Sequence, residues 1–149
     1  MTGGRLLEGY PHRMAGHCGS GALRDLLEWA GLAWGGEAAA EGLVFGLGGA
    51  LHFSYMRVPG LTPPVYLVGR GGDMEVDLLG RLGAGVDLRR TDDEALGWQW
   101  VRDELVAGRP VMVWADIAEL PYLRVRLQMS RHDVVIVGYD DEREIAYVV

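Results

Sequence analysis

Two residues, Cys18 and His132, have the types and settings needed for nucleophilic chemistry. Cys18 is the single cysteine among 149 residues, so it cannot form an internal disulfide and remains a free thiol. Small residues surround it, and leucines at helical spacing follow, which predicts a thiol at the first turn of a helix. The amides and dipole at a helix N-terminus stabilise a thiolate, the form that attacks acyl groups. The alternative is a small buried residue without chemistry.

His132 begins the apolar run from Asp133 to Tyr139, which predicts a core strand. A ring held at the start of a rigid strand suits a general base. The alternative is an ordinary histidine that is satisfied by hydrogen bonds. We predict that Cys18 and His132 form a catalytic pair, which requires the first long helix to lie against the start of this late strand.

The segments around both residues resemble the N-terminal domain family of butirosin biosynthesis protein H. The resemblance rests on five stretches of sequence, namely His17–Leu27, Glu41–Tyr55, Gly108–Val111, Asp116 with Leu120–Tyr122, and His132–Asp141. It implies a fold similar to that of the bacteriocin-processing cysteine peptidases and, more remotely, papain. It also implies that Cys18 and His132 act in acyl transfer. In the named member, an aminoacyl group moves from an acyl carrier protein thioester to an aminoglycoside amine.

The resemblance therefore implies a cysteine-dependent acyltransferase of secondary-metabolite biosynthesis. Its expected partners are an acyl carrier protein and a small-molecule amine acceptor, and phosphopantetheine is expected only as part of the carrier-protein substrate, with no other cofactor. Two alternatives stay open at this point. One is a cysteine peptidase that cleaves a leader peptide with the same pair, and the other is a catalytically silent module that binds a carrier or a peptide.

Papain-like sites also use a third residue, which orients the histidine. If the last hairpin turns about Glu142, the residue facing His132 is near position 152, beyond Val149. We therefore predict an orienting Asp or Asn past Val149, with Asp116 as a weaker internal substitute. The chain stops inside an apparent strand, so we expect residues 1–149 to be a single papain-like catalytic domain at the N-terminus of a longer two-domain protein.

The papain-like enzymes place a glutamine about six residues before the nucleophile, where it stabilises the oxyanion, and this chain has His12 there. His12 and His17 are therefore candidate oxyanion donors, with plain surface placement as the alternative. The chain has neither a second cysteine nor a paired ligand motif beside these histidines. We expect no metal site.

Four further residues are candidates for partner binding. Arg124, Arg126 and Arg131 form a basic stretch without an acid, which would suit an acidic carrier protein or would simply be a solvated strand face. Glu41, in a glycine-rich segment, would either bind the acceptor amine or cap a turn. The net charge of −7 and the isoelectric point near 5.0 argue against nucleic acid and anionic membrane as partners. No apolar segment resembles a membrane span or a signal peptide, so we expect a cytoplasmic protein, whose oligomeric state the sequence does not indicate.

The surrounding pattern predicts an α+β domain with a papain-like cysteine peptidase fold, in which N-terminal helices pack on a mainly antiparallel sheet. The first helix should bury its leucines and direct Arg24, Asp25 and Glu28 outward. Thr91 and Glu94 have the spacing of a capping box. We predict helices over residues 21–30, 37–45, 73–82 and 91–107 and strands over residues 51–55, 65–68, 111–115, 133–139 and 145–149.

Overall fold

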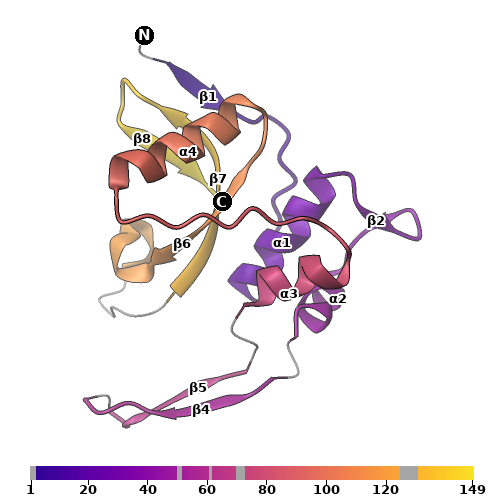
Figure 1. Cartoon of the computed structure of the whole chain (residues 1–149), viewed down its shortest axis with the longest axis vertical. Coiled ribbons are helices and arrows are strands. Elements are labelled where there is room, and N and C mark those ends of the chain that lie inside the picture. Colours follow the sequence, from indigo (N-terminus) through magenta and orange to yellow (C-terminus); the bar gives the residue numbers. More distant parts are fainter. Residues whose placement is uncertain (1–2, 50–51, 61, 70–72, 125–130) are drawn as a thin grey trace.

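The computed structural model describes residues 3–49, 52–60, 62–69, 73–124 and 131–149 (Figure 1). Four α-helices and several antiparallel strands make up the described chain, which confirms the α+β class. The strands are β1 (Gly4–Leu6), β2 (Ala33–Trp34), β3 (Glu37–Ala38), β4 (Ser54–Arg57), β5 (Val65–Val68), β6 (Val111–Asp116), β7 (Arg131–Asp140) and β8 (Ile145–Val148). The helices are α1 (Cys18–Trp29), α2 (Glu41–Leu47), α3 (Met74–Arg81) and α4 (Glu94–Val106), with short 3-10 helices η1 (Ile117–Glu119) and η2 (Pro121–Leu123).

The long strand β7 organises the main sheet, because β1, β6 and β8 all pair with it in antiparallel fashion. Ile136 lies opposite Val148, the pairing that a turn about Glu142 predicts. A register shift between Ile136 and Gly138 then offsets the pairs nearer the turn by one residue. The predicted hairpin is confirmed, and a β-bulge accounts for its deviation from the simple register.

Helices cover both faces of this sheet, and β6 shows which helix lies on which face. Val111 and Val113 pack with the cluster that α4 forms through Leu105, whereas Met112 packs with the cluster of α1, α2 and α3. Neighbouring side chains of a strand point to opposite faces, so the two clusters lie on opposite sides of the sheet. Figure 1 shows α4 lying across the sheet and α1, α2 and α3 grouped together next to it. No helix in the described part of the chain has the length and apolarity needed to cross a membrane.

Several predicted elements need correction at their ends. The helix expected from residue 37 begins at Glu41, because residues 37 and 38 pair with β2 instead. The cap of α4 is Asp93, whose carboxylate accepts from the amides of Ala95 and Leu96, so the expected capping box from Thr91 is wrong. The short strand β1 was not predicted, because its three exposed residues carry no periodic signal.

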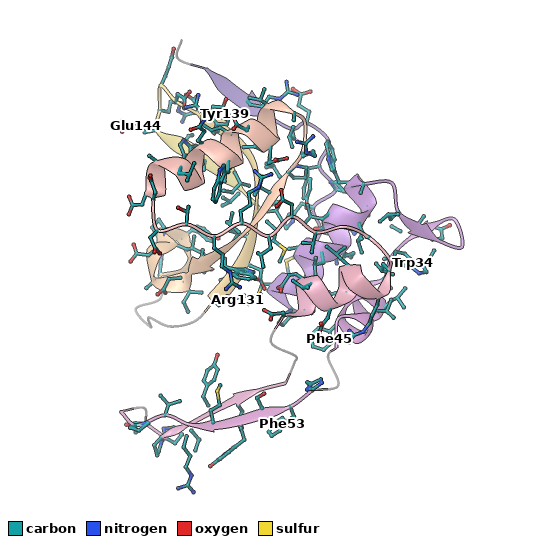
Figure 2. The ribbon with its side chains drawn as sticks, viewed as in Figure 1. Trp34, Phe45, Phe53, Arg131, Tyr139 and Glu144 are labelled. Carbon is teal, nitrogen blue, oxygen red and sulfur yellow. The ribbon has the colours of Figure 1, made fainter. Side chains whose placement is uncertain are left out.

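The β4–β5 hairpin extends away from the main sheet and the helices (Figures 1 and 2). Phe53, which precedes β4, and Tyr55 are both more than half exposed. The strand predicted over residues 51–55 is therefore displaced towards the hairpin, where it pairs with β5 rather than with the main sheet.

Candidate functional site

Cys18 is the first residue of α1, as the sequence predicts, and its side chain is partly exposed. The neighbouring glycines allow this helix start to press against its surroundings. A Cβ at Gly19 would lie 2.6 Å from Asp133 Oδ2, and one at Gly21 would lie 2.3 Å from the Cβ of Ala15. Both positions are therefore tightly packed, and a larger residue would have to displace the side chains of β7 and α3 at Gly19 or the preceding loop at Gly21.

Glu41 at the start of α2 holds the loop that leads into Cys18. Its carboxylate accepts hydrogen bonds from the amides of Gly16 (3.0 Å) and His17 (2.9 Å) and from the Ser20 hydroxyl (2.9 Å). Burial alone would raise the pKa of Glu41, but these three hydrogen bonds and the charge of Arg24 outweigh it, so the pKa lies below its ordinary value. Of the two roles considered for Glu41, these contacts are those of a turn cap.

Arg24 holds the same loop from the other side. Its guanidinium donates to the carbonyl oxygens of Arg13 (2.7 Å) and Met14 (3.3 Å) and to Asp25 Oδ1 (2.8 Å). Arg24 and Asp25 are both buried, so the prediction that they lie on the outer face of the helix is wrong. The loop covers that face, and its two carbonyls and the pairing with Asp25 compensate the buried charge. The backbone just before Cys18 is thus fixed by side chains of α1 and α2.

The thiol of Cys18 meets a carboxylate from the sheet. Cys18 Sγ donates to Asp133 Oδ2 at 3.6 Å, and the Asp133 side chain is 0% exposed. Asp133 Oδ1 lies 3.4 Å from Nε of Arg131, whose Nη2 lies 2.6 Å from Glu75 Oε1. The Arg131 guanidinium also stacks 3.8 Å from the centroid of the Trp114 ring. A chain of thiol, carboxylate, guanidinium and carboxylate therefore runs from α1 across β7 to α3, and Figure 2 shows Arg131 at the end of β7.

The structure does not bring the side chain of His132 to Cys18. Arg131 and Asp133 contact each other and lie on the α1 side of β7. His132 stands between them and pairs with Ala115, so the alternation of the strand directs its ring to the opposite face. No hydrogen bond joins Cys18 and His132 in the described ranges, and the carboxylate of Asp133 occupies the place that we predicted for the imidazole. The predicted strand does lie against α1, but the side chain that reaches the thiol from it is that of Asp133 and not that of His132.

Asp116 does not serve as the internal substitute that orients His132. It lies opposite Arg131 in the sheet, and directly paired residues share a face, so Asp116 lies on the face opposite to His132. Its carboxylate accepts from the amide of Ala118 and starts η1. This expectation is therefore wrong for a reason of strand parity.

The two candidate oxyanion donors lie in different surroundings. His12 Nδ1 is 3.5 Å from Asp25 Oδ2, beside the buried pair of α1. His17 is the N-cap of α1, and its Nδ1 accepts from the Ser20 amide at 3.3 Å while its ring packs edge-on against Phe45. With Nδ1 as acceptor, a neutral His17 ring carries its proton on Nε2, where it can donate.

The arginines of the predicted basic stretch do not form one surface. Arg131 turns inward to Glu75 and Asp133 and is not a free surface cation. Arg124 is exposed at the end of η2, in a left-handed backbone conformation with φ +52°. Arg126 lies outside the described residues.

Sequence reasoning missed Asp133 and Glu75. A signal for Asp133 was present, because a carboxylate followed by four apolar residues in a strand needs a buried partner, and Arg131 stands two residues away on the same face. Glu75 gave no such signal, since a glutamate in the first turn of a helix is ordinarily solvated. Only the packing of α3 brings it to Arg131.

Comparison with protein families identifies a match over most of the chain. The family model described as "Butirosin biosynthesis protein H, N-terminal" matches residues 17–149, which include α1, α3 and β7 and hence all four members of the thiol cluster. No curated protein and no solved structure matches the chain.

Proposed function

We propose that this chain, which belongs to the family of butirosin biosynthesis protein H N-terminal domains, transfers acyl groups in secondary-metabolite biosynthesis and carries them on Cys18. The family name supports the biosynthetic setting. The observation that carries the catalytic part is the contact between the partly exposed Cys18 thiol and the buried Asp133 carboxylate at the N-terminus of α1. The contact gives the thiol a fixed direction and gives its proton an acceptor.

The proposed first step loads the enzyme. Cys18 Sγ attacks the carbonyl carbon of a carrier-protein thioester, and its proton passes to Asp133 Oδ2. The new Sγ–C bond replaces the bond to the carrier sulfur, and the departing carrier thiolate takes up that proton. The developing oxyanion would be stabilised by amides at the start of α1 and by the Nε2–H group of His17.

The proposed second step unloads it. A primary amine attacks the acyl carbon on Cys18, so that an N–C bond forms and the Sγ–C bond breaks. One amine proton passes by way of Asp133 to the sulfur, which restores the thiol. The acceptor class, a small-molecule amine, rests on the family alone. Arg124, exposed at the end of η2, is a candidate contact for an acidic carrier protein, and charge reversal there should raise the KM for carrier-bound substrate.

Intact mass spectrometry tests the proposal directly. The protein is incubated with an acyl N-acetylcysteamine thioester, a small mimic of the phosphopantetheine arm. We expect one acyl adduct, which is absent in Cys18→Ala and is released as an amide when a primary amine is added. Asp133→Asn should form the same adduct more slowly, because the proton acceptor is lost.

The same protein samples separate the rival functions. Cleavage of peptides with dependence on Cys18 would favour a peptidase over a transferase. A protein that neither forms an adduct nor cleaves peptides, although it is folded and its thiol is accessible to alkylation, would exclude both enzyme classes and leave a binding module.

A further inference from the structure

Glu75 lies beyond the residues that touch the thiol, yet it is connected to them through Arg131. Its side chain is 8% exposed, and one carboxylate oxygen, Oε1, lies 2.6 Å from Arg131 Nη2. The other oxygen, Oε2, is buried and has no hydrogen-bond partner in the described part of the chain. Arg131 is therefore the cation on which the buried charge of Glu75 depends.

Arg131 divides one positive charge between two buried carboxylates. Its contact with Glu75, at 2.6 Å, is much closer than its contact with Asp133, at 3.4 Å. Stacking on Trp114 keeps the guanidinium beside both carboxylates. Of the two carboxylates, Asp133 is the one farther from Arg131, and it is the one that faces the sulfur of Cys18.

We infer that Glu75 is a positioning residue that, by holding Arg131, controls through Asp133 the reactivity of Cys18. The inference takes the proposed chemistry of Cys18 as its premise but does not need an acyl donor to be tested. When Glu75 is neutral, Arg131 compensates Asp133 more fully, and a thiolate at Cys18 meets less like charge. The groups around the sulfur that bear on this balance are Asp133 and Arg131 on β7, Glu75 on α3, Glu41 on α2, Asp116 on β6 and His17.

The experiment measures the rate of Cys18 alkylation by iodoacetamide against pH, by intact mass, in the full chain. Glu75→Gln should move the midpoint of the profile down by about half a pH unit, which is roughly threefold in rate below the midpoint. The plateau at high pH should not change. Glu75→Asp, which keeps the charge, should stay close to the original midpoint. Glu104→Gln removes the same charge from an arginine-paired glutamate on α4, across the sheet, and should leave the profile unchanged.

A second background tests whether Asp133 transmits the effect. In Asp133→Asn, adding Glu75→Gln should shift the midpoint by much less than it does in the parent chain. An equal shift in both backgrounds would show direct action on the sulfur and overturn the inference. An unchanged midpoint in Glu75→Gln would also overturn the inference. A higher alkylation rate at high pH without a shift of the midpoint would overturn it too, because that result indicates only a more accessible thiol.

The outcome is separable from that of the proposed function. These shifts without an acyl adduct would refute acyl transfer and keep the role of Glu75. An acyl adduct without these shifts would support acyl transfer and refute the role of Glu75.

Discussion

Replacing Asp133 by asparagine should change alkylation and acyl transfer in opposite directions. The side chain keeps its size and can still contact both Cys18 and Arg131, but the negative charge 3.6 Å from the sulfur is removed. Iodoacetamide reacts with the thiolate, so it requires charge on the sulfur but no proton acceptor in the site. Acyl transfer between positioned groups does use the acceptor. The same substitution therefore speeds the first reaction and slows the second.

Coulomb's law gives the size of the first effect. Two unit charges at that separation repel by about 1 kcal/mol in bulk water and by about 5 kcal/mol at an effective dielectric constant of about 20. Partial compensation of Asp133 by Arg131 favours the lower figure. About 1 kcal/mol corresponds to roughly a sixfold increase in alkylation rate below the midpoint of the pH profile.

The assay follows the parent chain, Asp133→Asn and Glu75→Gln by intact mass at pH 7 with iodoacetamide in excess. We expect Asp133→Asn to react about sixfold faster and Glu75→Gln to show the smaller increase. Far-UV circular dichroism and urea unfolding confirm that each variant is folded. If Asp133→Asn reacts no faster than the parent chain, the Asp133 carboxylate does not repel negative charge on the sulfur of Cys18. The electrostatic interpretation of the Cys18–Asp133 contact would then be wrong.

Three further predictions concern the scaffold. Because the pKa of Glu41 is lowered from 4.5 in the folded chain, its carboxylate adds stability that is complete above that pH and is lost as the pH falls through the lower folded value. The difference in urea midpoint between Glu41→Gln and the parent chain should therefore be largest near neutral pH and should shrink in acid; a constant difference would contradict this. Gly19→Ala should destabilise the chain by about 1–3 kcal/mol in urea unfolding, because its Cβ meets Asp133 and Met74, and an unchanged midpoint would refute that close packing. Leu78→Ala, at a position that is 0% exposed, should cost about 2–5 kcal/mol in the same assay, whereas a loss below about 1 kcal/mol would place Leu78 outside the core.

The sequence was informative where one physical rule decides the outcome. Leucines at helical spacing after small residues located α1 and put Cys18 at its start, and the uninterrupted run from Val134 to Val137 required a strand buried on both faces. Rules of this kind operate within one element, so they do not depend on the rest of the fold.

The choice between His132 and Asp133 could not be made in that way. It depends on the parity of β7 relative to α1, and parity is fixed by pairing with β6, which is distant in sequence. A one-residue difference reverses which side chain reaches the thiol. The burial of Arg24 and Asp25 depends in the same way on the loop that folds back over α1. Helical periodicity identifies a polar face but does not tell whether another segment covers it.

The site keeps the placement of Cys18 separate from the charge around it. Glu41 and Arg24 hold the backbone that leads into α1, whereas Asp133 and its two ionic neighbours surround the sulfur. Because Glu41 is paired with Arg24, its loss should chiefly loosen the approach to the thiol and raise the alkylation plateau, while loss of the Glu75 charge should chiefly move the midpoint. If both substitutions changed the same parameter, placement and charge would belong to one coupled network, and a description of Cys18 in terms of two independent supports would fail.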